Sequence, residues 1–309
     1  MDKKLLRGGI FGFLAAISSG MVPVMFSLLL RRNTDFLSII FIITLITIAL
    51  IIRYIIATGR PLFMGLNNTL RISLLGIPLA GSALLWAYSL MTVNAGISTA
   101  IFFTFPLMMP MVTAAVMHDR LSNVAFLGIL GGIIGLFFIG SGIIRSENAS
   151  LLGMSYALVA AFFYAIYVVG INHHSIYPLS GATIALWSLI ALEVIFLGLI
   201  IVRGSFTVPC DLTSWIYILL IACIPVLVVY PFNGCCIRYR GYTFTSVIYF
   251  IMPLSAVIFG GIFGLPITMR TMLGALIIAV SGAVVAGTRN MSRHIIRTSS
   301  LIPAKRHKH

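Results

Sequence analysis

The sequence predicts an all-α integral membrane protein of ten transmembrane helices, built as an inverted repeat of five plus five helices. Three observations carry this prediction: the composition, the length of the apolar stretches and an internal repeat. Of the 309 residues, 60% are hydrophobic and only 8% are charged, and the mean hydropathy is +1.13. Six acidic and twenty basic residues cannot cover the surface of a water-soluble protein of this length.

Apolar stretches of about twenty residues, the length that crosses the hydrocarbon core of a bilayer, fill most of the chain. The connections between them are too short to hold a soluble domain. The predicted spans are approximately 8–30, 36–57, 71–91, 96–116, 124–142, 151–171, 181–202, 214–236, 243–263 and 270–288. Residues 290–309 are expected to form a basic cytoplasmic tail without regular structure.

The internal repeat relates residues 76–140 to residues 223–287 at a constant offset of 147 positions. Each half holds five predicted spans, and an odd number forces the second copy to cross the membrane in the opposite sense. We therefore predict a first five-helix repeat over 1–145 and a second over 146–289. Inverted repeats are typical of secondary transporters, in which the substrate site lies near the midplane between the halves.

Lysine and arginine residues are distributed unevenly between the two sides of this predicted topology. Fifteen fall on the side that holds both termini and five fall on the other side. By the positive-inside rule, the N- and C-termini are expected in the cytoplasm, and the protein is expected to be a multi-pass protein of the plasma (inner) membrane. The apolar run after Lys3 continues to Leu30, which is too long for a cleaved signal peptide.

Several motifs resemble the drug/metabolite transporter superfamily, in its EamA-type branch. In the first half the motifs are residues 85–91 (LWAYSLM), 95–100 (AGISTA), 105–107 (FPL) and 119–122 (DRLS). In the second half they are residues 237–239 (IRY), 245–247 (TSV), 252–254 (MPL) and 266–268 (PIT). The resemblance covers nearly the whole chain and implies a ten-helix basket with a central cavity and alternating access.

Glu193 is the only acidic residue inside a predicted span, and it lies far from both ends of that span. At about 1.5 Å per residue, it sits about 13–18 Å from either membrane surface. Ionisable groups at that depth are costly and usually face a cavity or a partner. Glu193 is therefore predicted to bind a substrate ammonium group or to couple transport to protons. The alternative is a protonated or hydrogen-bonded carboxyl between packed helices.

Aromatic side chains gather in the spans that are expected to face inward. A cavity lined by them would offer flat apolar walls and a few hydrogen bonds, as small-molecule sites do. The alternative for each ring is packing or contact with lipid. The predicted lining consists of Trp86, Phe102, Tyr164, Tyr230, Asn233 and Tyr249. The repeat relates Phe102 to Tyr249 and Trp86 to Asn233, and residues so related are called repeat mates below.

Prolines and glycines recur inside the predicted spans. Proline removes a backbone hydrogen bond and bends a helix. The bends are predicted either as hinges for alternating access or as static curvature, and they occur at the mates Pro78 and Pro225 and the mates Pro106 and Pro253. Glycines crowd the fifth predicted span, where small residues let helices approach closely. Packing within the chain is the first interpretation there, and a homodimer is left open.

The sequence lacks the motifs that would indicate ATP-driven transport or a zinc site. It has no Walker motif and no Cys/His spacing of a zinc site, so neither ATP-driven transport, a cofactor nor a bound metal is expected. The predicted function is non-enzymatic: a secondary transporter, and by the resemblance an exporter, of a small polar metabolite such as an amino acid or an amine. A proton or a counter-substrate would drive it, lipids would surround it, and no nucleic acid is expected.

Other classes of function stay open at this point. An exporter of organic cations or drugs would depend on Glu193 and on aromatic faces. A channel or a membrane scaffold would show no saturable substrate binding. An intramembrane enzyme would need paired acids, a histidine-rich metal cluster or a nucleophile with its base, and the spans hold one glutamate.

Overall fold

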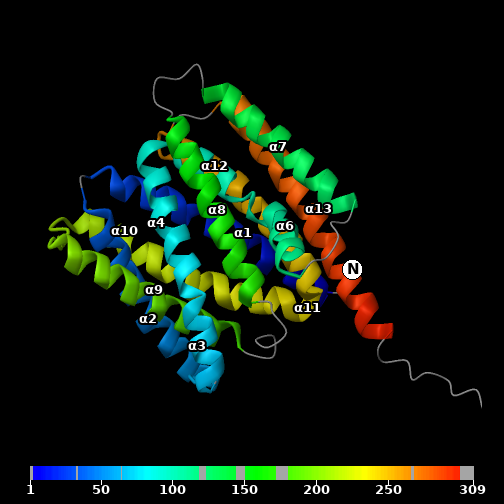
Figure 1. Ribbon diagram of the computed structural model, residues 1–309, viewed down its shortest axis with the longest axis horizontal. Coiled ribbons are helices and arrows are strands. Elements are labelled where there is room, and N and C mark those ends of the chain that lie inside the picture. The colour runs from blue at the N-terminus through cyan, green and yellow to red at the C-terminus, as the bar shows by residue number, and fades with distance from the viewer. Residues whose placement is uncertain are drawn as a thin grey trace, which may run out of the picture.

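The computed structural model describes residues 3–299 except 33, 64, 118–122, 144–149, 172–179 and 266–267, and every regular element in these residues is helical (Figure 1). The α-helices are α1 (Lys3–Leu30), α2 (Phe36–Ala57), α3 (Leu66–Leu74), α4 (Gly76–Thr92), α5 (Ala95–Phe102), α6 (Phe105–Met117), α7 (Asn123–Ile143), α8 (Leu151–Ile171), α9 (Gly181–Arg203), α10 (Leu212–Cys223), α11 (Tyr230–Ile248), α12 (Met252–Ile262) and α13 (Met269–Ser299). A π-helical segment, η1 (Ile224–Val229), joins α10 to α11, and a 3₁₀ turn, η2 (Tyr249–Ile251), joins α11 to α12.

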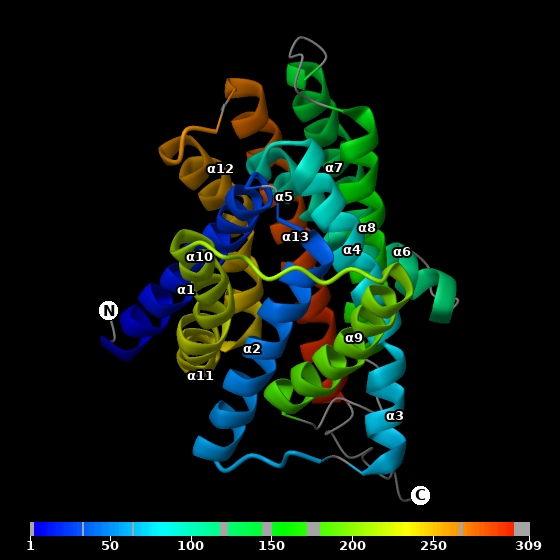
Figure 2. The same cartoon turned by 90° about the vertical axis from the view of Figure 1, so that its left-hand side faces the viewer.

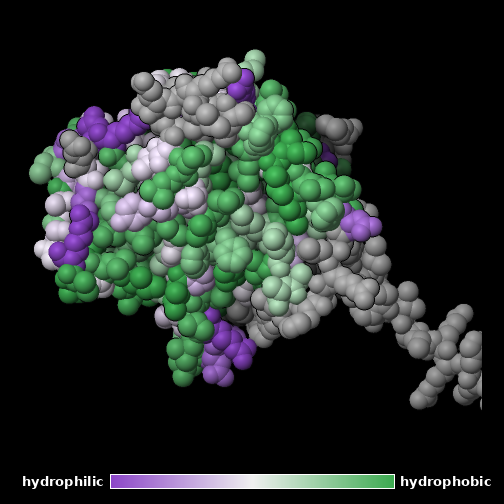
Figure 3. Space-filling view, turned by 45° about the horizontal axis from the view of Figure 1, so that its top comes forward, coloured by the Kyte–Doolittle hydropathy of each residue, from purple (hydrophilic) through white to green (hydrophobic). Residues whose placement is uncertain are grey.

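The helices are long and apolar enough for a multi-pass membrane protein. Within the described residues, seven helical stretches meet the length and hydropathy of a membrane span, and shorter apolar helices cover Asn123–Ile139, Tyr249–Ile262 and Met269–Val285. The seven stretches are Lys4–Leu30, Phe36–Ala57, Leu66–Thr92, Ala95–Ala115, Leu151–Ile171, Gly181–Arg203 and Leu212–Arg240. Figure 3 shows a mostly hydrophobic face on which polar residues gather towards the margins.

The two halves of the repeat make equivalent internal contacts. In the first half, the hydroxyl oxygens of Ser89 and Ser98 lie 2.8 Å apart. Their repeat mates are Cys236 and Thr245, and the Thr245 hydroxyl donates to the Cys236 Sγ at 3.2 Å. The same pair of positions is therefore bonded in both halves, although the side chains differ.

Helices of the two halves interleave instead of forming separate bodies. α2 packs against α9 and α7 against α13, and each of these pairs joins a helix to its counterpart in the other half; α5 packs against α12, which is the counterpart of α6. Figure 1 shows α7 and α13 side by side, and Figure 2 shows α2 beside α9. The rings of the mates Phe103 and Phe250 also meet, with 6.4 Å between their centroids. The interface between the halves is therefore lined by side chains from both.

The four repeat-mate prolines each lie directly after a helix break. Pro78 stands in the first turn of α4, after α3 ends at Leu74, and its mate Pro225 stands in η1. Pro106 is the second residue of α6, after the break between α5 and α6, and Pro253 is the second residue of α12, after η2. Because proline has no N–H, the hydrogen bond to the preceding turn is missing at each site. The bends are part of the fold, and their role as hinges stays a prediction.

Two boundaries differ from the sequence prediction. Residues 238–241, expected as a break, have helical backbone. However, Asn233 Nδ2 lies 2.9 Å from the Tyr249 hydroxyl, whereas sixteen residues of straight helix would separate them by about 24 Å. The helical run therefore folds back on itself between these residues. The second difference is α13, which continues to Ser299 because residues 288–299 contain neither glycine nor proline to end it.

Candidate functional site

A chain of aromatic rings connects α4, α5, α6 and α8. Trp86 of α4 stacks on Phe102 of α5, with 5.1 Å between the ring centroids. Phe102 in turn contacts Tyr164 of α8 at 5.3 Å and Phe105 of α6 at 5.8 Å. Tyr164 contacts Tyr167, one turn further along α8, at 5.8 Å. Three rings that the sequence predicts as lining residues, those of Trp86, Phe102 and Tyr164, are thus neighbours.

Tyrosine side chains from several helices converge beside these rings. The side chain of Tyr230 of α11 lies near those of Tyr164, Tyr167 and Tyr249 of the second half and that of Tyr54 of the first. The side chain of Tyr164 also lies near that of Tyr249. The ring of Tyr54 stacks on that of Tyr230 at 6.2 Å. These side chains are called the ring cluster below, and they therefore lie where the two halves meet. The cluster consists of Tyr54, Trp86, Phe102, Phe105, Tyr164, Tyr167, Tyr230 and Tyr249.

Hydrogen bonds tie the ring cluster to α1 and α9. Asn233 Nδ2 donates to the Tyr249 hydroxyl at 2.9 Å, and that hydroxyl lies 3.3 Å from Ser19 Oγ of α1. The Tyr167 hydroxyl donates to Ser188 Oγ of α9 at 3.2 Å. These bonds fix the orientation of two phenols inside an otherwise apolar bundle.

Trp86 and its repeat mate Asn233 each leave one buried polar atom free. Among the described residues, Trp86 Nε1 and Asn233 Oδ1 have no hydrogen-bond partner. Buried polar atoms are nearly always hydrogen-bonded in native proteins, so such atoms call for a partner. The indole can only donate and the amide oxygen can only accept. The two mates therefore present one donor and one acceptor to any ligand that binds at the ring cluster.

Glu193 lies on α9 and is buried, with 9% of the residue exposed. Neither carboxylate oxygen has a hydrogen-bond partner in the part of the chain that the structure describes. Ser188, which holds the ring cluster to α9, is five residues earlier and hence about 140° away around the helix axis. Glu193 therefore lies on a different face of α9 from the cluster. The structure brings together the other six predicted site residues: Trp86, Phe102, Tyr164, Tyr230, Asn233 and Tyr249.

Sequence reasoning missed Ser19, Tyr167 and Ser188 as members of the site. Tyr167 could have been found, because residues three apart share one face of a helix and Tyr164 is a predicted lining residue. The two serines could not, because a serine in an apolar span is just as common in helix packing. Their roles depend on which helix lies opposite.

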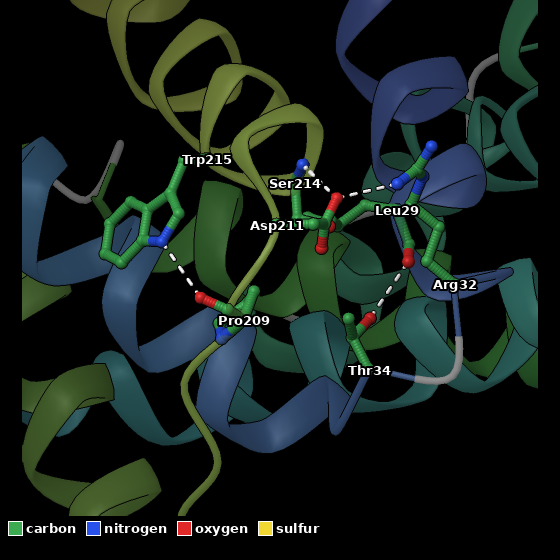
Figure 4. A network of polar contacts seen from close by, with 7 residues as sticks. All are labelled: Leu29, Arg32, Thr34, Pro209, Asp211, Ser214 and Trp215. Atoms are coloured by element: carbon green, nitrogen blue, oxygen red, sulfur yellow. Dashed lines mark hydrogen bonds and ion pairs between the residues drawn. The ribbon is translucent and has the colours of Figure 1, made fainter.

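Two ion pairs connect the halves at the end of the bundle where α1 ends and α2 begins. Arg32 Nη1, just after α1, lies 2.6 Å from Asp211 Oδ2, and Figure 4 shows this ion pair. Asp211 also accepts from the backbone N–H of Ser214 and so caps α10. Arg203, at the end of α9, lies 2.5 Å from Asp35, which caps α2. Each pair joins a residue of the first half to one of the second.

Both aspartates are held in the ionised form. Partial burial raises the pKa of Asp35, but hydrogen bonds from Ser38 and the nearby Arg203 outweigh it, and the pKa lies below its usual value. A hydrogen bond from Ser214, and then the charge of Arg32, lower the pKa of Asp211. The two ion pairs therefore persist at neutral pH.

Comparison with known proteins gives a family and a fold. Residues 6–141 and 151–287 each match the model of a family described as the EamA-like transporter family. A solved structure described only as "Crystal structure of protein" is similar over 92% of this chain and 98% of its own, with a TM-score of 0.59 and 16% sequence identity. At that identity the likeness shows the fold alone. A search of curated proteins found no match.

Proposed function

Because the chain belongs to the EamA-like transporter family, we propose that it is a secondary transporter that moves a small polar metabolite, such as an amino acid or an amine, by alternating access. The seven long and three shorter apolar helical stretches would cross the plasma (inner) membrane as two inverted sets of five. Both termini would lie in the cytoplasm, and the direction would be export. A proton or a counter-substrate would supply the driving force.

The pairing of repeat mates at the ring cluster carries this proposal. Trp86 and Phe102 meet in the first half, and their mates Asn233 and Tyr249 meet in the second. Inverted-repeat transporters bind substrate between their halves, where corresponding positions face one site. A cluster built from corresponding positions, with unpartnered buried atoms on both sides, fits such a site.

The chemistry of the ring cluster suits a small polar molecule with a flat or apolar part. The rings of Trp86, Phe102 and Tyr164 would cover the apolar part. Trp86 Nε1 would donate to an acceptor on the substrate, and Asn233 Oδ1 would accept from a donor such as an amino group. A phosphorylated or nucleotide-linked substrate would need basic partners, and none of the described members of the ring cluster is basic.

The second candidate is export of organic cations or drugs. The stacked rings favour it, because aromatic faces attract cations within about 6 Å of the ring centroid. Such substrates would bind through the faces of Trp86 and Phe102 and would not need Asn233. The effect of Asn233→Leu on binding therefore separates the two candidates.

Thermal unfolding of the detergent-purified protein against amino acids, amines, organic cations, sugars and nucleotides tests the proposal. A ligand that binds only the folded state raises the apparent melting temperature by an amount that depends on its concentration relative to its Kd. A saturable shift with an amino acid or an amine, weakened in Asn233→Leu, is expected, followed by flux of that compound in proteoliposomes. A protein that binds and moves no member of the panel would contradict the proposal.

A further inference from the structure

α2 and α9 run in opposite directions, and contacts near both ends fix which residues face each other. At one end Arg203 pairs with Asp35. Near the other end Ala182 and Ile55 belong to one packed cluster. Interpolation between these two contacts places position 193 of α9 level with position 44 of α2. Glu193 and Thr44 therefore lie at the same height, near the middle of both helices.

Glu193 faces α2. On α9 it shares a strip with Leu186 and Ile200, seven residues away on either side, a spacing that returns to nearly the same face. Leu186 packs in one cluster with Ile51 of α2. Ile200 packs in another with Ile40 of α2. The strip that includes Glu193 is thus the strip that covers α2, while Ser188 and the ring cluster occupy another side of α9.

Thr44 is the polar side chain of α2 at this level, and it is only 7% exposed. The flanking residues of the two helices are apolar and buried; they include Ile40, Ile42, Ile51, Leu192 and Phe196. The crossing of α2 and α9 therefore encloses one carboxyl and one hydroxyl within a hydrocarbon environment.

Other charged groups on the neighbouring helices lie away from this point. α9 also packs against α3 and α4. α4 contains no ionisable residue except the exposed Tyr88. Arg71, in the last turn of α3, and Arg53, near the end of α2, are both exposed. None of them bonds Glu193, because neither of its carboxylate oxygens has a partner among the described residues.

A proton suits this site better than a metal ion. Hard cations such as Mg²⁺ or Ca²⁺ need about six or more oxygen ligands, and the crossing offers one carboxyl and one hydroxyl. A buried carboxylate without a counter-ion costs several kcal/mol. The protonated acid is neutral and needs one acceptor for its O–H; the Thr44 hydroxyl at the same level can serve as that acceptor after a change of side-chain rotamer, since the two groups are not bonded in this structure. We propose that Glu193 and Thr44 form a proton-binding site at the crossing of α2 and α9, separate from the ring cluster.

The proton site can be linked to transport because α9 takes part in both sites. Glu193 lies on one face of the helix, and Ser188, which is bonded to the ring cluster, lies on another. The role of the proton site as the coupling site rests on the proposed transport function, whereas proton binding does not. α2 belongs to the first half and α9 to the second, so a movement between the halves changes the access of water to Glu193. The same movement carries Tyr167, which is bonded to Ser188 of α9, along with the second half and shifts it against the first-half rings of Trp86 and Phe102. The proton binds to the carboxylate when water reaches it and is carried as the neutral acid when the helices close.

Infrared difference spectroscopy of the purified protein in lipid tests proton binding without any substrate. The chain has only six acidic residues, and exposed carboxyls are ionised above a pH of about 5. The wild-type protein should show the C=O stretch of a protonated carboxyl above that pH, and Glu193→Gln should lack it. Thr44→Val should shift the frequency of the band without removing it. Asp211→Asn, which changes an exposed carboxyl, is the matched control and should keep the band.

Flux of the substrate in proteoliposomes then tests the coupling role. Wild-type uptake should respond to an imposed pH gradient, and Glu193→Gln should lose this response. A protonated-carboxyl band that is absent in the wild type, or that survives in Glu193→Gln, would overturn the proton site. Flux that keeps its pH response in Glu193→Gln would overturn the coupling role of Glu193, but the proposed transport function would still stand. If the protonated-carboxyl band behaves as expected but the protein shows no flux, the proton site stands and the proposed transport function is contradicted.

Discussion

Asn233 and Tyr249 are joined by a 2.9 Å hydrogen bond at the positions where the other half of the molecule stacks Trp86 on Phe102. The repeat thus preserves the contact and changes its chemistry from ring stacking to a polar bond. A substrate between the halves would meet an aromatic wall on one side and an amide and a phenol on the other. Such an unequal site would bind a molecule with one apolar and one polar end in a single orientation.

Removing the Tyr249 hydroxyl should weaken ligand binding. In Tyr249→Phe the amide of Asn233 loses its fixed orientation, and a net hydrogen bond of about 0.5–1.5 kcal/mol corresponds to roughly a two- to twelvefold increase in Kd. The ligand concentration at the half-maximal thermal shift measures the change. Tyr156→Phe, a change outside the ring cluster, is the control and should leave the Kd unaltered. Equal Kd values for Tyr249→Phe and the wild type would place the ligand elsewhere.

Substitutions in the two equivalent hydrogen-bonded pairs of the repeat should have different effects on the stability of the protein. Ser89→Ala leaves the buried Ser98 hydroxyl without its partner and should destabilise the protein by about 1–3 kcal/mol. Cys236→Ser gives the second half a pair of hydroxyls, with Thr245 in place of the second serine of the first half, and it should change stability by less than about 0.5 kcal/mol. Apparent melting temperatures in detergent measure both. A more damaging effect of Cys236→Ser would show that the two halves are not equivalent here.

The packing of α7 on α13 requires a glycine at position 135. A Cβ atom there would lie 2.9 Å from the carbonyl oxygen of Gly274 and 2.6 Å from Ile278. Gly135→Ala should therefore destabilise the protein by about 1–3 kcal/mol, as overpacking does. Gly198→Ala is the matched control on α9, because no atom lies within 4 Å of the added Cβ. It should be neutral or stabilising by up to about 1 kcal/mol, since alanine is the better helix former.

The ion pair between Asp35 and Arg203 should stabilise the fold in a pH-dependent way. Because the pKa of Asp35 is lowered in the folded state, its stabilisation is complete above the ordinary pKa of about 3.9 and is lost as the pH falls through the lowered value. Asp35→Asn keeps a good N-cap but removes the charge, so it should lower the free energy of unfolding by about 0.2–1 kcal/mol at neutral pH.

Melting curves from neutral to acidic pH would measure this difference. The gap between the wild type and Asp35→Asn should close at low pH, whereas Asp35→Ala should stay less stable by a further 0.5–2 kcal/mol or so, because the cap is lost as well. A gap that is independent of pH would show that the charge of Asp35 contributes nothing.

Much of the fold follows from the sequence because its causes are local or periodic. Apolar stretches of membrane-crossing length occur along a chain, and so do the prolines that end a hydrogen-bonding ladder, as Pro78 and Pro225 do. The offset of 147 positions is enough to relate Trp86 to Asn233. The sequence did not predict the helical backbone at 238–241 or beyond 289. The chain does reverse between Asn233 and Tyr249, as the break predicted there requires, but it does so with helical backbone at 238–241.

The amino-acid sequence alone therefore establishes the class, the repeat and the side chains available to a site. Which of these side chains meet is set by the packing of the helices. That packing pairs Tyr167 with Ser188, ties Arg203 to Asp35 and leaves Glu193 on a different face of α9 from the ring cluster. The physical reason is that helix periodicity tells which residues share a face, whereas the neighbour of that face depends on how helices distant in the chain pack together.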